Sequence, residues 1–183
     1  MEIREKVAVV TGAGSGIGRA VVQRLAHEGA AVVVADVDED AGSNAVPEIH
    51  AEGGRAAFLL VAVASEADVQ WMVAFVGEEF GSLDVLVNNA GGVAEPYFPE
   101  SEPAQWGRAV DLNLCGTMLG IHFVIRAMQK RGGGAIVNIS SYAPIDGGSR
   151  FHALVIRTTC RGIDPVHFVC SALSHQQEQR ADG

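Results

Sequence analysis

The sequence has 183 residues, of which 48% are hydrophobic and 19% are charged, and its formal net charge is -9. This length fits one domain with a substantial core, and the composition excludes a disordered chain. No apolar run reaches the roughly 18 residues of a membrane span and the first residues do not resemble a signal peptide, so a cytoplasmic location is expected. The acidic balance opposes nucleic-acid binding, which depends on Lys and Arg. No metal site is expected, because the cysteines show neither CxxC spacing nor a His cluster: Cys115, Cys160 and Cys170.

The first three-quarters of the chain alternate between strand-like and helix-like segments. Residues 6–11 form a β-branched run that ends at glycines, apolar residues at helical spacing follow up to Leu25, and residues 31–36 are typical of a strand buried on both faces. Further helices are expected at about residues 40–51, 66–80 and 103–130, and further strands at about residues 56–61, 83–88 and 135–140. This alternation predicts a single α/β domain over residues 1–183, with a doubly wound, Rossmann-like parallel sheet.

The last thirty residues have a different character. Residues 154–162 are β-branched where a helix would continue the alternation. Asp164 and Pro165 are typical of a helix start, and the residues that would share one face of a short terminal helix are Val166, Val169, Cys170 and Leu173. The pattern is therefore consistent with a short helix at the end of an atypical tail.

A glycine-rich turn separates the first strand from the first helix. Its spacing is T-G-x-x-x-G-x-G, through Thr11, Gly12, Gly16 and Gly18, and it differs from G-x-G-x-x-G because Ile17 stands where the last glycine of that pattern would fall. Glycines allow a close approach to a pyrophosphate, and a helix N-terminus offers free N–H groups and a positive dipole end. The turn therefore predicts a dinucleotide site, with a turn of purely structural importance as the alternative.

Asp36 closes the second strand about twenty residues beyond the turn, where a carboxylate accepts hydrogen bonds from ribose hydroxyls. The same carboxylate would repel the 2′-phosphate of NADP, and the glycine turn contains no Arg or Lys. These features predict NAD as the cofactor. The alternative is a solvated acid at a strand end, because Asp38, Glu39 and Asp40 follow.

Residues 88–91, Asn-Asn-Ala-Gly, directly follow the fourth strand, and together with the glycine turn they resemble the short-chain dehydrogenase/reductase family. Asn113 and the strand that ends at Ser140 and Ser141 extend the resemblance, which covers about residues 5–153. It implies a nicotinamide-dependent oxidoreductase acting on an alcohol/carbonyl pair, and a homo-oligomer formed through the helix at about residues 103–130.

The resemblance also implies roles for individual residues. Ser141 would hydrogen-bond the substrate oxygen, Asn113 would hold a water molecule in the proton relay, and Asn88 would tie strands together. The residues expected to bind the cofactor are Gly12, Ser15, Gly16, Ile17, Gly18, Asp36, Val63, Asn89, Ala90 and Gly91.

Two departures from the family pattern concern the cofactor and the chemistry. Ala62 stands where the family usually has an Asp that binds the adenine amino group. The family's Tyr-x-x-x-Lys motif should fall at about Leu154 and Thr158, and the chain has only two tyrosines and two lysines, none of them in the tail. The sequence also ends before the last two strands expected of the family's sheet.

Three hypotheses follow from these departures. The chain is an NAD(H)-dependent oxidoreductase with impaired activity, or a non-catalytic NAD-binding module, or the product of a reading-frame change or truncation after about Ala153. The residues that would select a substrate belong to the part of the family pattern that this sequence lacks, so the substrate is left open.

Overall fold

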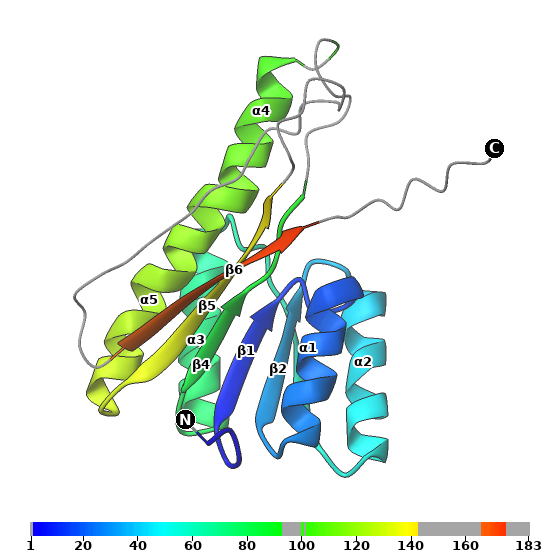
Figure 1. Ribbon diagram of the computed structural model, residues 1–183, viewed down its shortest axis with the longest axis vertical. Coiled ribbons are helices and arrows are strands. Elements are labelled where there is room, and N and C mark those ends of the chain that lie inside the picture. The colour runs from blue at the N-terminus through cyan, green and yellow to red at the C-terminus, as the bar shows by residue number, and fades with distance from the viewer. Residues whose placement is uncertain (1, 93–99, 101, 143–165, 175–183) are drawn as a thin grey trace, which may run out of the picture.

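The computed structural model describes residues 2–92, 100, 102–142 and 166–174, with the backbone alone for residues 141, 142 and 166–174. Strands and helices alternate along these residues (Figure 1). The first half contains β1 (Val7–Thr11), α1 (Gly16–His27), β2 (Ala31–Asp36), α2 (Glu39–Ala51), β3 (Arg55–Leu60) and α3 (Glu66–Glu79). The second half contains β4 (Val85–Asn88), α4 (Pro103–Val110), a π-helical turn (Asp111–Cys115), α5 (Gly116–Lys130), β5 (Gly134–Tyr142) and β6 (Val166–Ser174).

The strands form one sheet in the order β3-β2-β1-β4-β5-β6, and every strand pair is parallel. The chain runs outward from β1 to β3 and then returns to the other side of β1 with β4. The order of the strands therefore reverses between β1 and β4, and in such sheets ligands bind at the carboxyl ends of the strands at this reversal. The predicted doubly wound, Rossmann-like sheet is confirmed.

Two hydrophobic layers hold helices on opposite faces of the sheet. Alternate residues of each strand enter different layers: Val9 and Leu86 pack with α3 and α5, whereas Val10 and Val87 pack with α1 and α2. Both faces of the central strands are therefore buried, which explains why β1 and β2 are apolar without a break.

The predicted helix over residues 103–130 is present, with an interruption that the hydrophobic pattern did not reveal. A π-helical turn, Asp111–Cys115, joins α4 to α5 and contains Asn113. Among the described residues this is the one helix that is long and apolar enough to cross a membrane, with a mean hydropathy of 1.2 and 28% of that window buried. Its α5 part packs on the sheet through Ile121, Val124 and Met128.

The prediction of a short terminal helix in the tail is wrong. Val166–Ser174 is the strand β6, which pairs with β5 from Gly134↔Val166 to Tyr142↔Ser174. The backbone groups of β5 would otherwise lie at the edge of the sheet, and pairing with them outweighs a local pattern that fits a helix. Residues 154–162 lie outside the described residues.

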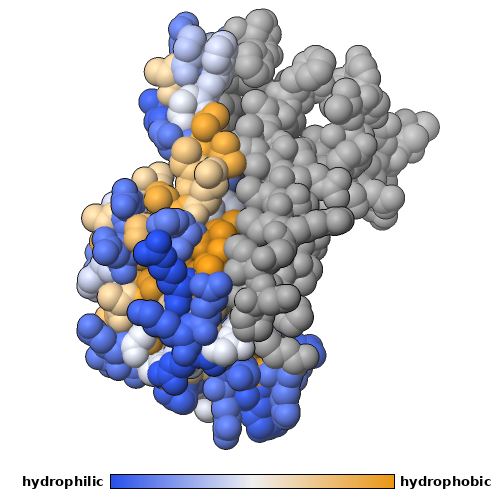
Figure 2. Space-filling model, turned by 90° about the vertical axis from the view of Figure 1, so that its left-hand side faces the viewer, coloured by the Kyte–Doolittle hydropathy of each residue, from blue (hydrophilic) through white to orange (hydrophobic). Residues whose placement is uncertain are grey.

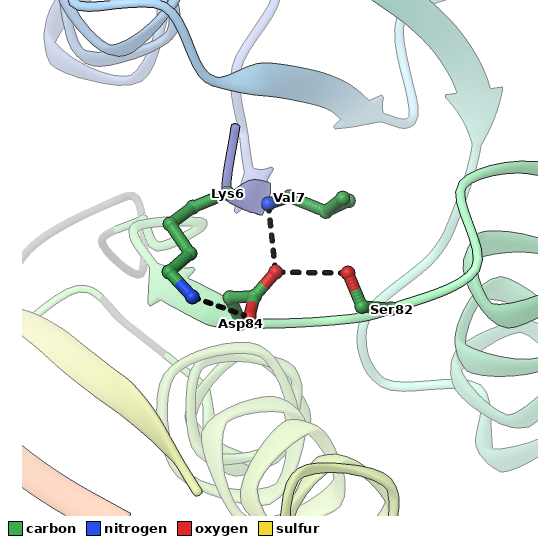
Figure 3. A network of polar contacts seen from close by, with 4 residues as sticks. All are labelled: Lys6, Val7, Ser82 and Asp84. Carbon is green, nitrogen blue, oxygen red and sulfur yellow. Dashed lines mark hydrogen bonds and ion pairs between the residues drawn. The ribbon is translucent and has the colours of Figure 1, made fainter. Parts of the chain in front are cut away.

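The amino ends of β1 and β4 are joined by the carboxylate of Asp84 (Figure 3). Its Oδ2 accepts hydrogen bonds from the Val7 N–H and the Ser82 hydroxyl, each at 2.9 Å, and its Oδ1 lies 3.4 Å from Lys6 Nζ. The Asp84 N–H in turn donates to the Val7 carbonyl at 2.9 Å. These contacts hold the register of β1 against β4 at the end of the sheet opposite the glycine turn.

Replacing Glu5 with glycine should stabilise the fold. Glu5 is the one non-glycine residue with a positive φ in the described chain, at 64°, and a left-handed conformation costs an L-residue roughly 1–2 kcal/mol. After the greater entropy of glycine in the unfolded chain is subtracted, we expect the free energy of unfolding to rise by about 0.5–1 kcal/mol. Urea denaturation measures it, with Glu2→Gly as the control; a lower midpoint for Glu5→Gly would contradict the strain.

Candidate functional site

The glycine turn leaves the start of α1 open to solvent. Gly12 and Gly16 have φ values of 62° and 53°, and a Cβ added to Gly16 would meet no atom within 4 Å. Ser15 is the N-cap of α1 and its hydroxyl makes no capping hydrogen bond, while Ile17 is 48% exposed. The first N–H groups of α1 therefore face a space that can receive an anion.

Gly18 is required for a different reason, because it lies where two segments meet. A Cβ on Gly18 would stand 2.2 Å from the Gly12 carbonyl oxygen and 2.5 Å from Asn89 Nδ2. The first turn of α1 therefore packs directly on the backbone of the glycine turn and on the loop after β4.

The carboxylate of Asp36 is held beside the glycine turn. Its Oδ2 accepts a hydrogen bond from the Gly14 N–H at 2.7 Å, and its Oδ1 accepts one from the Asp38 N–H at 3.0 Å. A carboxylate has about four lone-pair positions, so each oxygen keeps the capacity to accept a further hydroxyl. Asp36 is half-buried and oriented, which differs from a freely solvated acid.

The loops after β1 and β4 are joined by two polar side chains. The hydroxyl oxygen of Thr11 accepts hydrogen bonds from the N–H groups of Asn89 and Ala90, both at 3.0 Å. The side-chain amide of Asn89 donates to the carbonyls of Thr11 and Gly12, at 2.9 and 3.0 Å. The structure thus brings the predicted residues Gly12, Asn89 and Ala90 together. The part played by the Thr11 hydroxyl was missed by the sequence analysis.

Asn113 lies on the π-helical turn and holds the next part of the loop after β4. Its Nδ2 donates to the carbonyls of Gly92 and Ala109, both at 2.8 Å, and its Oδ1 accepts from the Gly92 N–H at 3.1 Å. A Cβ on Gly91 would stand 2.9 Å from Asn113 Oδ1, so the loop passes close to the amide. Both amide hydrogens are engaged with backbone, and the role of Asn113 toward a water molecule stays a prediction.

Val63 lies in the turn between β3 and α3, where it contacts the start of α5. It is 7% exposed, and a Cβ on Gly116 would stand 2.8 Å from Val63 Cγ2. On the other side of this turn, Asp68 Oδ2 accepts a hydrogen bond from the Ala62 N–H at 3.0 Å. Asp68 was also missed by the sequence analysis, although the Ser65-x-x-Asp68 spacing at a helix start could have indicated it.

Two expected residues lie on neighbouring strands. Asn88 was expected to tie strands together, and this is confirmed, because its buried amide donates to Asn138 Oδ1 of β5 at 2.8 Å. Ser141 lies in the last part of β5, where only the backbone is described.

Arg19, the first basic residue after the glycine turn, is engaged by a neighbouring helix. Its guanidinium forms an ion pair with Glu48 of α2, and Gln23 donates to the same carboxylate at 3.2 Å. The hydrogen bond from Arg19 lowers the pKa of the Glu48 carboxyl below its ordinary value. This ion pair joins α1 to α2, and the positive charge of Arg19 is paired with the carboxylate of Glu48.

Gly18→Ala should destabilise the chain, because the added methyl group would overlap the Gly12 carbonyl. We expect a loss of about 1–3 kcal/mol in the free energy of unfolding, the usual cost of overpacking. Gly77→Ala is the matched control: Gly77 is an exposed residue of α3 with open space around it, so alanine should stabilise by about 0.5–1 kcal/mol. Thermal unfolding of both variants measures the difference, and equal midpoints would contradict the close contact.

Known proteins share both the sequence and the fold of this chain. The family model for short chain dehydrogenases matches residues 6–153. The cyclohexanol dehydrogenase of Acinetobacter sp. (strain SE19) is 39% identical over 147 residues, which are 80% of this chain and 59% of that protein. The cis-4-hydroxycyclohexanecarboxylate dehydrogenase of Sinomonas cyclohexanicum is 45% identical over 139 residues, which are 75% of this chain and 55% of that protein.

The solved structures give the same result. A 7α-hydroxysteroid dehydrogenase in complex with NADH and 7-oxo glycochenodeoxycholic acid superposes with a TM-score of 0.72 at 37% identity, over 76% of this chain and 55% of that one. This chain therefore spans between half and two-thirds of the length of these relatives. The matches to the family model and to both kinds of relative establish that the chain belongs to the short-chain dehydrogenase/reductase family.

Proposed function

We propose that this chain is an NAD(H)-dependent oxidoreductase for an alcohol/carbonyl pair, in which cofactor binding is retained and catalytic activity is impaired. The observation that carries the cofactor part is the Asp36 carboxylate held 2.7 Å from the Gly14 N–H of the glycine turn. The observation that carries the second part is the absence of Tyr-x-x-x-Lys from the sequence. We further propose a cytoplasmic location.

The described residues fit an adenine dinucleotide along the carboxyl ends of the strands. The open start of α1, with Gly12, Ser15, Gly16, Ile17 and Gly18, would receive the pyrophosphate. Asp36 would accept the hydroxyls of the adenosine ribose, Val63 would contact the base, and the Asn89, Ala90 and Gly91 loop would line the nicotinamide side. When bound, the nicotinamide would supply the position that accepts or gives up a hydride.

Two features favour NAD over NADP. The Asp36 carboxylate would repel a 2′-phosphate, and both of its oxygens are already oriented by backbone N–H groups. Arg19 is paired with Glu48, so its charge is committed to the contact between α1 and α2. The relative in complex with NADH supports a nicotinamide cofactor in this family.

Asp36→Asn should weaken NAD binding about 10-fold to 100-fold, because the amide keeps one acceptor oxygen but has no charge, so the charge-assisted hydrogen bonds from the ribose hydroxyls are lost. The same change should narrow the preference for NAD over NADP, because the repulsion disappears. Calorimetric titration of both cofactors measures the two effects. Asp40→Asn is the matched control, since Asp40 is an exposed residue of the first turn of α2; equal losses in both variants would contradict the assignment.

The catalytic part of the proposal rests on what remains of the family's pattern. Ser141 is proposed to hydrogen-bond the substrate oxygen, and Asn113 is proposed to hold a relay water molecule. General acid–base catalysis contributes roughly 10²-fold to 10⁴-fold to such reactions, and the chain lacks the family's tyrosine and lysine for it. We therefore expect a slow hydride transfer, which depends on the proximity of cofactor and substrate and on Ser141.

Turnover should be slow but measurable as a change in absorbance at 340 nm, with NADH and a panel of ketones or NAD and a panel of alcohols. A full-length relative with the complete motif serves as the control and should be roughly 10²-fold to 10⁴-fold faster. If NAD binds by calorimetry and no ketone or alcohol reacts, the chain is the second candidate, a non-catalytic NAD-binding module. If NAD does not bind, both candidates fail.

A small alcohol or ketone is the proposed substrate, and a second copy of the chain is the proposed partner. Figure 2 views the side on which α4 and α5 lie in Figure 1, and hydrophobic residues gather there in a strip. Exposed large hydrophobic side chains of this helix are Trp106, Val110 and Met118. An exposed apolar strip of this kind favours association through residues 103–130.

A further inference from the structure

We propose that Asp68, in the first turn of α3, is a positioning residue for the base-binding part of the nucleotide site. The inference rests on the proposed function, since it concerns the same cofactor. Its basis is a pair of hydrogen bonds to the Asp68 carboxylate, from the Ala62 N–H and the Ser65 hydroxyl, which hold the turn on either side of Val63.

The order of the strands locates the base. The pyrophosphate would lie on the turn after β1 and the ribose at Asp36 after β2, and the next strand outward is β3. The Val61 N–H donates to the Asp36 carbonyl at 2.9 Å, so the chain that follows β3 starts directly beside Asp36. A base that continues away from the pyrophosphate therefore meets the turn formed by residues 62–65.

Asp68 does not make the contact that its position in the helix would suggest. In a capping box, the carboxylate three residues after the N-cap accepts a hydrogen bond from the N-cap N–H. Here Ser65 is the N-cap and its N–H donates to the Ala62 carbonyl at 2.9 Å. Asp68 Oδ2 instead accepts from the Ala62 N–H at 3.0 Å, and its Oδ1 accepts from the Ser65 hydroxyl at 2.9 Å.

These bonds leave one backbone donor of the turn for a ligand. Within the part of the chain that the structure describes, the Val63 N–H has no hydrogen-bond partner, although Val63 is only 7% exposed. Buried backbone N–H groups are normally paired, so a ligand atom is a natural partner. Gly116 packs against the Val63 side chain, and Asp68 fixes the residue before it, so the direction of this N–H is set from both sides.

The side chain of Ala62 is a methyl group and cannot hydrogen-bond a base. Recognition of the base by this turn then depends on the Val63 N–H, which requires a hydrogen-bond acceptor on the base. The N1 atom of adenine is an acceptor, whereas the N1 atom of hypoxanthine carries a hydrogen. The turn should therefore prefer adenine to hypoxanthine as long as Asp68 holds it.

Asp68 is charged at neutral pH, as this role requires. The hydrogen bond from the Ala62 N–H, followed by that from the Ser65 hydroxyl, lowers the pKa of the Asp68 carboxyl below its ordinary value. An ionised carboxylate accepts both bonds at once.

The test compares the affinities of NAD and nicotinamide hypoxanthine dinucleotide, measured by calorimetry for the wild type, Asp68→Asn and Asp68→Ala. We expect the wild type to prefer NAD about tenfold, the value of one hydrogen bond. Asp68→Ala should bring the ratio of the two dissociation constants close to one. Asp68→Asn, which keeps one acceptor oxygen, should give an intermediate ratio and serves if the alanine variant does not fold. Glu66→Gln, which removes a charge from the same exposed turn, should keep the wild-type ratio.

The ratio separates positioning from a merely structural role. If Asp68 only stabilised α3, its loss would weaken both dinucleotides by the same factor and leave the ratio unchanged, and that result would overturn the inference. A wild-type ratio near one would also overturn it. If the wild type binds neither dinucleotide, the proposed function itself fails and the inference fails with it.

Discussion

The site depends on one constraint, the hydrogen bonds that join the carboxyl ends of β1 and β4. The Thr11 hydroxyl oxygen accepts hydrogen bonds from the N–H groups of Asn89 and Ala90. The side-chain amide of Asn89 donates hydrogen bonds to the carbonyls of Thr11 and Gly12. Because the strand order reverses at this pair, two loops from distant parts of the sequence become one surface. The close contact of Gly18 with the Gly12 carbonyl and the Asn89 amide belongs to the same surface.

The part of the chain that would bind a cofactor and the part that would carry the chemistry differ in how many of the expected residues are present. Around the glycine turn, hydrogen bonds to backbone groups orient the side chains of Asp36, Asn89 and Asn113. For the chemistry, Ser141 is the proposed remaining residue, because the sequence lacks the Tyr-x-x-x-Lys motif. A site can keep its binding energy when its proton transfer is lost, because the two depend on different residues.

The fold could be predicted from the sequence because each central strand is an uninterrupted apolar run bounded by glycines or helical spacing. The tail could not, since Val166, Val169 and Cys170 fit one face of a helix as well as a strand, and pairing with β5 decided between them. The positions of Gly12 and Asp36 relative to one another followed from the βαβ pattern. The contacts of Thr11, Asp68 and Gly116 could not be foreseen, because they depend on how closely separate elements approach in space.

The pairing of β1 with β4 also determines when the sheet can be completed. The bond between Val7 and Asp84 joins residues 77 positions apart, whereas β1 and β2 are neighbours along the chain. During synthesis from the N-terminus, β1 can pair with β2 early, but its other edge has no partner until β4 has left the ribosome. Contacts of such long sequence separation slow folding and expose strand edges in the meantime. The strand at the centre of the finished sheet is thus an outer edge for much of the time that the chain is being made.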